Sequence, residues 1–475
     1  MAHDCAFLED LLPSDRVSFR ADARDEHATD FGTDVEGQGV QPDAVAWPDS
    51  TADVSAVLEA ADERGVPVTP YAAGTSLEGN AVPAHEGISL DLTRMNEVLD
   101  VRPEDFQLDA EPGVMGPAIE EAAGAHGLFF PPLPSSGDIS TIGGMVVNDA
   151  SGMQTVKYGE VADWVLGLEA VLADGSVIRT GGRAKKTSSG YNLGELLVGS
   201  EGTLAVVTKV TISLAGIPEQ IRGGRAIFET LDDAAAAVTD AVQSGVDVAK
   251  IELVDATSAR MANNYLDSDL PDAPMVFLEF HANHGIEAEI DFCRTVFDAH
   301  DPLRFELGDE EEMETLWTAR KELAFAVADW DPDLAPLVPG DVTVPISDLP
   351  TMVRQVQDVA EEYDVLIPTF GHAGDGNLHY AILVDHGDPD HVERGKAASD
   401  AIVERAIELG GTATGEHGVG MGKREYMLRE YGEATVEAMR SIKYALDPND
   451  TLNPGKIFPE TADGERVRRP ARMER

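Results

Sequence analysis

The sequence is poor in cysteine. Only two cysteines occur in its 475 residues, Cys5 and Cys293, and they lie far apart. An iron–sulfur cluster or a cysteine-rich zinc site needs several thiolates, commonly with Cys-x-x-Cys spacing. We therefore expect neither kind of site within this chain.

Basic residues are also scarce. The chain has 35 Lys and Arg residues, of which ten are Lys, against 87 Asp and Glu residues, and its formal net charge is -52. Because no basic face is available to neutralise the phosphates of a nucleic acid, we expect no direct nucleic-acid binding. Hydrophobic residues make up 43 %, and the acids are spread among apolar segments, which indicates a folded protein with an acidic surface. Molar salt screens such a surface, so we expect a halophile's cytoplasm.

Long apolar runs are absent as well. No stretch approaches the roughly 18 residues of a membrane-spanning helix. The N-terminal MAHDCAFLEDLLPSD has no basic region followed by an apolar run. We therefore expect neither an integral membrane segment nor a signal peptide. The expected location is the cytoplasm, with peripheral attachment to the inner face of the membrane left open. The basic tail 466–475 is interpreted as a frayed terminus.

The length exceeds the usual limit of one hydrophobic core, so two or more domains are expected. Residues 43–101 alternate strand-like runs with a helical pattern, whose start is marked by Ser50 or Thr51 and whose end is marked by Gly65. The strand–helix pattern restarts after Pro218. We divide the chain into an N-terminal segment, two domains and a tail, at 1–39, 40–217, 218–458 and 459–475.

Three glycine-rich loops lie in the first of these domains: PYAAGTSLEGN at 70–80, SSGDISTIGGMVVNDASG at 135–152 and GSEGT at 199–203. One such loop is usually a turn, but three in one domain indicate backbone that approaches a phosphate-bearing ligand from several sides. A Rossmann site is excluded because Gly-x-Gly-x-x-Gly with a downstream acid is missing. GVGMGKR does not fit a P-loop, because His417 stands where the first glycine should be.

Two more glycine-rich stretches carry side chains that bind metals. In GHAGDGNLH, strand-like segments flank the glycines, so a hairpin would bring His372 and His379 to one point. GTATGEHGVGMGK adds the adjacent Glu416 and His417. Two imidazoles and a carboxylate suit Zn²⁺, Mn²⁺ or Fe²⁺. From the residues alone, a metal site and a pair of polar turns are about equally supported.

In this order, these stretches resemble the vanillyl-alcohol oxidase/p-cresol methylhydroxylase (PCMH) superfamily over roughly residues 40–458. The chain is most similar to the branch of FAD-dependent D-lactate dehydrogenases, the glycolate oxidase catalytic subunit and D-2-hydroxyglutarate dehydrogenase. The resemblance implies an α+β fold. A two-subdomain PCMH-type FAD-binding domain would be followed by an α/β cap domain for the substrate, with an antiparallel sheet and a C-terminal helical segment.

The resemblance also implies that the loops bind FAD. Ala72 stands where the family usually has glycine, so the first loop is expected to sit slightly differently. No histidine lies in that loop or near Gly143 to form an obvious covalent link, so we expect non-covalent FAD. The positions carried over as FAD contacts are Gly74, Thr75, Ser76, Leu77, Gly79, Asn80, Thr141, Gly143, Gly144, Ser151, Gly152, Glu201, Gly202, Val206, Val207 and Asn453.

The same resemblance implies the chemistry. His372, His379 and Glu416 would bind a divalent metal, His417 would act as the base, and Arg320 would pair with the substrate carboxylate. LVPGDVTVP lacks a lysine that some relatives have there, which argues against a dicarboxylate substrate. The implied reaction oxidises a D-2-hydroxy acid, D-lactate first and glycolate next. The metal assists deprotonation of the hydroxyl, and hydride passes to the flavin.

Two other functions stay open: a catalytically silent FAD-binding subunit of a complex, and a metal-dependent hydrolase without flavin. The intact site residues argue against the first, and visible flavin absorption would exclude the second. The expected electron acceptor is a quinone, an electron-transfer flavoprotein or an iron–sulfur subunit, the last as in the glycolate oxidase alternative. The expected substrate partner is a small 2-hydroxy acid, and a homodimer is left open.

The acidic surface gives a first prediction. Raising KCl from 0.1 M to 1 M shortens the Debye length from about 10 Å to about 3 Å, which weakens repulsion between surface carboxylates. The midpoint of thermal unfolding, followed by circular dichroism, should rise by several degrees. A midpoint that is unchanged or lower at 1 M KCl would contradict the expected adaptation to salt.

Overall fold

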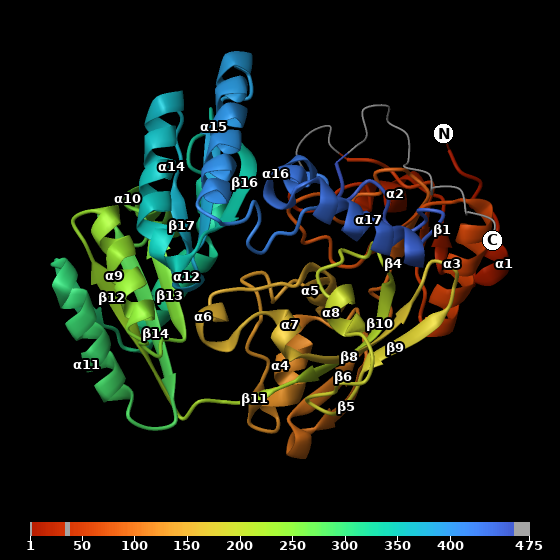
Figure 1. Ribbon diagram of the computed structural model, residues 1–475, viewed down its shortest axis with the longest axis horizontal. Coiled ribbons are helices and arrows are strands. Elements are labelled where there is room, and N and C mark those ends of the chain that lie inside the picture. The colour runs from red at the N-terminus through yellow and green to blue at the C-terminus, as the bar shows by residue number, and fades with distance from the viewer. Residues whose placement is uncertain (1, 34–38, 460–475) are drawn as a thin grey trace. The chain divides into compact units, whose positions relative to one another are not determined.

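The computed structural model describes residues 2–33 and 39–459 (Figure 1). The basic tail 466–475 lies outside the described residues. The chain folds into two compact units, each of which is described by itself. Of the described residues, the first unit contains 2–33, 39–150, 160–217 and 416–459. The second unit contains residues 151–159 and 218–415.

A four-stranded sheet opens the first unit. Its strands follow the order β1-β2-β4-β3, and both β2 and β3 run parallel to β4. The expected helix is α3 (Thr51–Arg64), where the Ser50 side chain accepts from the backbone N–H of Asp53 and Gly65 ends the helix at φ +64°. The strands are β1 (Val17–Ser18), β2 (Ala44–Ala46), β3 (Val68–Tyr71) and β4 (Ile88–Asp91).

A five-stranded antiparallel sheet, in the order β5-β6-β10-β8-β9, forms the other half of the first unit. Its inner face packs against α5, α7 and α8 in one hydrophobic core. The strands are β5 (Val98–Arg102), β6 (Gln107–Ala110), β8 (Val165–Val171), β9 (Val177–Gly181) and β10 (Val206–Ser213), with the separate pair β7 (Leu128–Phe129) and β11 (Ala215–Gly216).

Further helices complete the first unit, and three of them belong to its C-terminal segment. Among residues 2–33 and 39–459, no helix combines the length and the apolar character that crossing a membrane requires. The helices are α1 (Leu8–Leu11), α2 (Ala21–Glu26), η1 (Pro103–Asp105), α4 (Gly116–Gly124), α5 (Ile142–Asn148), α7 (Val161–Trp164), α8 (Leu193–Leu197), η5 (Arg424–Tyr426), α16 (Met427–Tyr431) and α17 (Glu433–Leu446).

The second unit is built on a seven-stranded sheet in the order β15-β12-β14-β13-β17-β18-β16. Every neighbouring pair is antiparallel. The strands are β12 (Gln220–Ile227), β13 (Lys250–Val254), β14 (Met275–Ala282), β15 (Arg304–Leu307), β16 (Ala335–Thr343), β17 (Thr369–His372) and β18 (Asn377–Val384).

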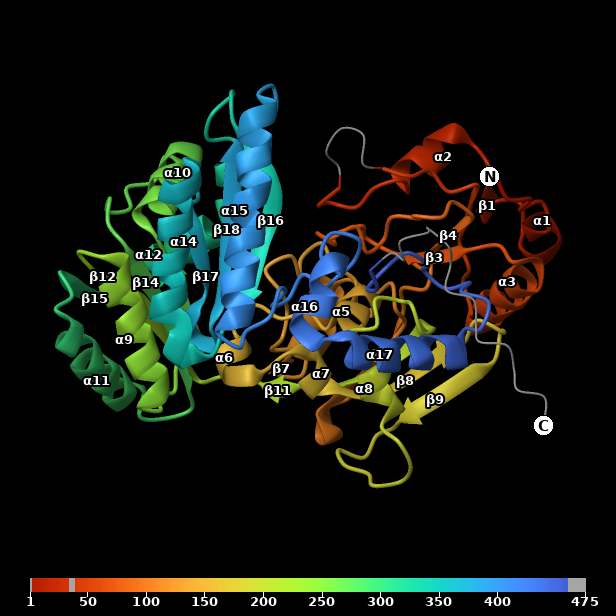
Figure 2. The same cartoon turned by 45° about the horizontal axis from the view of Figure 1, so that its top comes forward.

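Helices cover the two faces of this sheet differently. Four long helices lie side by side along one face: α9 (Leu231–Gln243), α11 (Ile286–Phe297), α14 (Leu349–Tyr363) and α15 (Pro389–Glu408) (Figures 1 and 2). The opposite face packs Phe370 and Leu383 against α10, α12 and α13. The remaining elements are α6 (Thr155–Tyr158), α10 (Ala256–Leu266), η2 (Asp298–His300), α12 (Glu310–Lys321), α13 (Leu323–Ala328), η3 (Ile346–Asp348) and η4 (Ala373–Asp375).

Candidate active site

Polar side chains form a row across the face of the seven-stranded sheet that packs against α10, α12 and α13. The strand register places Glu252 of β13 directly opposite His372 of β17. His379 of β18 lies opposite both Phe370 of β17 and Asp341 of β16. Because alternate residues of a strand share a face, all five side chains point to the same side of the sheet.

The hairpin between β17 and β18 brings the two predicted metal-ligand histidines together. The ring centroids of His372 and His379 lie 5.0 Å apart, with the rings at 88° to each other. Glycine is needed in the turn for two reasons. Gly376 has φ +83°, which L side chains rarely adopt. A Cβ on Gly374 would lie 2.4 Å from Cγ2 of Ile251.

One buried carboxylate joins the metal-ligand group to the substrate-binding group. Glu252 accepts a hydrogen bond from Nε of Arg320 at 2.6 Å and another from Nδ1 of His372 at 2.8 Å. Burial alone would raise the pKa of Glu252, but the charges and hydrogen bonds of these two partners hold the pKa below its ordinary value. An ionised carboxylate only accepts, so His372 carries a proton on Nδ1 and a neutral ring has its lone pair on Nε2.

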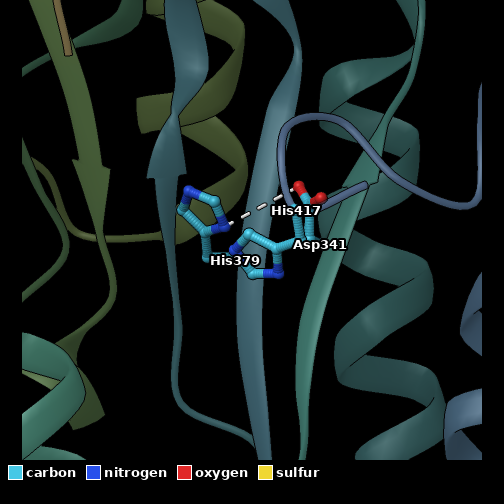
Figure 3. A group of neighbouring side chains, drawn as sticks. All are labelled: Asp341, His379 and His417. Carbon is cyan, nitrogen blue, oxygen red and sulfur yellow. Dashed lines mark ion pairs between the residues drawn. The ribbon is translucent and has the colours of Figure 1, made fainter. Parts of the chain in front are cut away.

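The pair of histidines fits a divalent metal ion. A metal-ligating histidine almost always donates its other ring N–H to a carboxylate, a carbonyl or water, which fixes the tautomer. His372 does this through Glu252. His379 has its Nδ1 3.8 Å from Oδ1 of Asp341, the pair marked by the dashed line in Figure 3. Each imidazole therefore has a carboxylate near Nδ1, within hydrogen-bond distance at His372 and beyond it at His379.

Arg320 comes from α12, close to the C-terminus of the helix. The pattern of LWTARKELAF at 316–325 is typical of one helix, but the structure ends α12 at Lys321 and begins α13 at Leu323. Arg320 is 4 % exposed, and its guanidinium carbon lies 5.0 Å from the ring centroid of Phe370. Its Nη2 atom is buried and has no hydrogen-bond partner among the described residues. Because buried polar atoms are normally paired, this nitrogen fits a ligand carboxylate.

The side chain of Asp341 holds the C-terminal residues of the second unit in place by hydrogen bonds. Its Oδ1 accepts from Nδ2 of Asn377 at 2.6 Å, and its Oδ2 accepts from Oγ1 of Thr414 at 3.0 Å and from the backbone N–H of Gly415 at 2.8 Å. The chain passes into the first unit directly after Gly415. The predicted metal ligand Glu416 and the predicted base next to it thus belong to the C-terminal segment of the first unit.

Within the first unit, the loop that carries these two residues is tied to several side chains. The backbone carbonyl of Glu416 accepts from Nδ2 of Asn148, at the end of α5, at 2.7 Å. Nδ1 of His417 lies 3.8 Å from Oε1 of Glu78, and Nζ of Lys423 lies 3.3 Å from the same oxygen. The imidazole therefore has a carboxylate near Nδ1, at a longer distance than the hydrogen bond that His372 makes in the second unit.

Glu201 holds the continuation of that loop. Its buried side chain accepts from the backbone N–H of Val419 at 2.7 Å, from that of Gly420 at 2.8 Å and from Nδ2 of Asn80 at 2.7 Å. Burial raises the pKa of Glu201, and these hydrogen bonds partly oppose the rise. Glu201 was expected along the cofactor, and its carboxylate is engaged with protein groups.

The three glycine-rich loops meet in the first unit. Oγ1 of Thr75 lies 3.1 Å from Oγ of Ser140, which connects the first loop to the second. Nδ2 of Asn453, in the segment LNPGKIF at 452–458, donates to the carbonyls of Asn80 and Glu201, at 3.0 Å and 2.8 Å, and so joins this segment to the first and third loops. Oδ1 of Asn453 is buried without a hydrogen-bond partner in the described part of the chain.

The other residues expected to contact FAD are spread over loops, helix α5 and strand β10. Gly74 and Gly79 have positive φ, Gly202 does too, and Thr141 is the N-cap of α5. A Cβ on Gly143 would lie 2.6 Å from Pro112. The side chains of Val206 and Val207, on β10, are buried in the cores. Ser151 and Gly152 belong to the second unit. Converging loops with positive-φ glycines fit the phosphates of a cofactor such as FAD, and the orphaned amide oxygen fits an N–H or O–H donor, which FAD also carries.

Two family descriptions match the chain: FAD binding domain over residues 42–181, and FAD linked oxidases, C-terminal domain, over residues 217–457. The chain belongs to the FAD-linked oxidase family. It is an FAD-dependent oxidoreductase. The expected PCMH-type FAD-binding domain with a mixed α+β fold is confirmed, and the family assignment removes the alternative of a hydrolase without flavin.

Curated relatives of this FAD-linked oxidase are similar over most of their length. A glycolate oxidase subunit GlcD from Bacillus subtilis is 38 % identical, covering 89 % of this chain and 90 % of the relative. A probable mitochondrial D-lactate dehydrogenase from Danio rerio is 35 % identical, covering 88 % of this chain and 84 % of the relative. The solved structure of p-cresol methylhydroxylase superposes with a TM-score of 0.78 at 18 % identity, covering 95 % of each chain, which shows a shared fold.

Four functional candidates were missed by sequence reasoning. Glu252 and Asp341 are charged residues on strands whose neighbours are apolar, and that contrast was the available signal. Glu78 lies inside the first glycine-rich loop, and Lys456 lies inside LNPGKIF, so motif membership could have identified both. Their partners are distant in the sequence and no local pattern reveals them.

Lys456 of the FAD-linked oxidase is a buried amine. Its Nζ donates to the carbonyl of Val82 at 2.6 Å. Burial lowers the pKa of Lys456 from its ordinary value to about 7, against the opposing effects of Glu201 and Asp30. The folded protein therefore releases this proton near neutral pH, while the unfolded chain keeps it to higher pH.

This difference predicts a pH dependence of stability. Between about pH 7 and the ordinary lysine range, the unfolded chain binds one more proton than the folded chain, so Lys456 favours folding increasingly as the pH rises. The free energy of unfolding of the wild type, relative to that of Lys456→Met, should rise by about 1.4 kcal/mol per pH unit above pH 7. Urea unfolding at several pH values, with FAD in excess, measures it. Lys186→Met, at an exposed lysine, should leave the slope unchanged, and a flat difference for Lys456→Met would refute the assignment.

Proposed function

We propose that the protein oxidises a small D-2-hydroxy acid, with D-lactate preferred, to the 2-oxo acid. The observation that supports this proposal most strongly is that the carboxylate of Glu252 accepts hydrogen bonds from both Arg320 and His372. A 2-hydroxy acid has its carboxylate and hydroxyl on adjacent carbons. Its carboxylate can pair with the guanidinium of Arg320, and its hydroxyl can reach a metal bound by His372, because these two side chains flank the carboxylate of Glu252. Lactate and glycolate, which appear in the names of the relatives, are both acids of this class.

In this proposal, residues 40–217 form the FAD-binding domain and residues 218–458 form the substrate and metal domain. The glycine-rich loops and Asn453 bind FAD without a covalent link. His372, His379 and Glu416 hold Zn²⁺, Mn²⁺ or Fe²⁺. When bound, FAD takes up two electrons and the hydrogen of the substrate's α-carbon, and the cation acts as a Lewis acid on the hydroxyl oxygen.

The chain's own residues position the substrate and move one proton. Arg320 binds the carboxylate, and the ring of Phe370 beside its guanidinium lowers the local dielectric and strengthens that pairing. His417 accepts the hydroxyl proton, because a neutral imidazole has one ring nitrogen with a free lone pair. Its Nδ1 lies towards Glu78, so Nε2 is the atom proposed to accept the proton.

A second candidate is glycolate oxidation by a catalytic subunit that works with an iron–sulfur partner. Two observations favour it: the 38 % identity to a glycolate oxidase subunit, and the presence of only two cysteines, too few to bind a cluster in this chain. Turnover of D- and L-2-hydroxy acids with an artificial dye separates the candidates. D-lactate should have the highest kcat/KM, and a higher value for glycolate would favour the second candidate.

The role of His417 gives a prediction. His417→Ala should lower kcat by about 10²–10⁴-fold, because the hydroxyl proton loses its acceptor. The flavin absorption bands should stay unchanged, since FAD is proposed to bind through other residues. His386→Ala, at an exposed histidine, is the matched control and should keep wild-type turnover. If His417→Ala turns over at the wild-type rate, another group is the base.

Metal removal gives a further prediction. Dialysis against a chelator should abolish dye reduction by D-lactate while the protein keeps its FAD, because the hydroxyl is no longer polarised. Added Mn²⁺ or Zn²⁺ should restore the activity, and His379→Ala should prevent the restoration. An enzyme that works equally well after its metal content has fallen to zero by elemental analysis would rule out the metal.

A further inference from the structure

Glu252 is a carboxylate with no exposed surface at the middle of β13. Its two oxygens have different partners: Oε2 accepts from Nε of Arg320, and Oε1 accepts from Nδ1 of His372. The partners lie 68 and 120 residues away in the sequence. Two charge-assisted hydrogen bonds stabilise an ion that burial alone would strongly disfavour.

The contact with His372 decides which ring nitrogen can bind a metal. Because Oε1 of an ionised Glu252 can only accept, the proton of the imidazole lies on Nδ1. The lone pair of Nε2 then points away from Glu252. A carboxylate behind a ligand histidine also raises the basicity of the ring and fixes its orientation.

The contact with Arg320 decides which guanidinium nitrogens can bind a ligand. Nε is occupied by Glu252 at 2.6 Å, and the ring of Phe370 restricts the plane of the guanidinium. Nη2 is buried without a hydrogen-bond partner in residues 2–33 and 39–459. A guanidinium held at Nε in this way keeps a preset direction for its remaining donors, so less rotamer freedom is lost when a carboxylate binds.

We propose that Glu252 is a positioning residue that couples metal binding to substrate-carboxylate binding. It acts through His372 and Arg320 and touches neither the reacting hydroxyl nor the flavin. The inference rests on the proposed function of these two partners. Loss of the Glu252 carboxylate therefore weakens the binding of the cation and, separately, the binding of the acid. If Glu252 only supported the fold, a folded variant would bind both ligands as the wild type does.

Glu279 offers a matched comparison on the same face of the sheet. It lies on the neighbouring strand β14, opposite Lys250, and is also buried. It pairs with Nζ of Lys250 at 2.9 Å and with Nε2 of His281 at 2.8 Å. The chemistry is the same as at Glu252, a carboxylate between a cation and an imidazole, but neither partner belongs to the proposed site.

The test is Glu252→Gln in the flavin-loaded, metal-stripped full-length protein. An amide of the same size cannot accept from both Nε of Arg320 and Nδ1 of His372, because one of its two polar atoms is a donor. The dissociation constant of Mn²⁺, measured by electron paramagnetic resonance without substrate, should rise by about 10–100-fold. In the Mn²⁺-saturated enzyme, KM for D-lactate should also rise by about tenfold or more, since a misplaced guanidinium loses its bidentate pairing.

Two further variants decide between positioning and folding. Glu279→Gln should change the Mn²⁺ dissociation constant and KM by less than about threefold, because its partners bind neither ligand. Glu252→Asp keeps the charge, but its side chain is one methylene too short to reach both partners. It should raise the Mn²⁺ dissociation constant by about tenfold. This variant tests the proposal if Glu252→Gln does not fold. Flavin absorption and the unfolding midpoint confirm that each variant is folded.

The proposal is overturned if a folded Glu252 variant binds Mn²⁺ and D-lactate as the wild type does, or if Glu279→Gln produces equal losses. Failure of the proposed function would look different. In that case the wild type itself would bind no Mn²⁺ or would oxidise no 2-hydroxy acid, whatever residue stands at position 252.

Discussion

In the second unit, the orientation of the proposed site residues depends on the pairing of buried charged side chains across neighbouring strands. Glu252 faces His372 across β13 and β17, and Asp341 faces His379 across β18 and β16. A buried charge is strongly disfavoured unless it is paired and hydrogen-bonded. Each carboxylate therefore needs its partners in place, and each partner is held in one orientation. The same pairings that satisfy the buried charges also direct the imidazoles and the guanidinium.

The first unit uses a buried carboxylate in a comparable way. Glu201 accepts hydrogen bonds from two backbone N–H groups of the loop after His417 and from Asn80 of the first glycine-rich loop. Asn453 then ties the carbonyls of Asn80 and Glu201 together. Segments from three distant parts of the sequence are thereby held in one arrangement. In each unit, a carboxylate hidden from solvent orders residues that the proposed chemistry uses.

Local signals in the sequence predicted much of the fold correctly. Ser50 caps the N-terminus of helix α3 and Gly65 ends the helix, as their capping preferences imply. The glycines of GHAGDGNLH turn the chain between β17 and β18. The break at Glu322, between α12 and α13, was not foreseen because the apolar spacing continues across it. The metal, FAD and catalytic roles of the named residues stay predictions.

Long-range contacts could not be read from the sequence. Glu252 sits in the strand-like KIELV, and nothing nearby shows that a histidine and an arginine share its carboxylate. Likewise, no local pattern shows that the residues after 415 return to the first unit. Register between strands and packing of α12 against the sheet decide these contacts, and both arise from the whole fold.

We propose that His372 and His379 hold a catalytic metal on the face of the seven-stranded sheet. Anomalous diffraction at the zinc absorption edge, from crystals grown with FAD and Zn²⁺, tests it most directly. We expect one strong peak about 2.1 Å from a ring nitrogen of each histidine. A fully occupied zinc site elsewhere in the chain, with no peak between these two rings, would contradict the account.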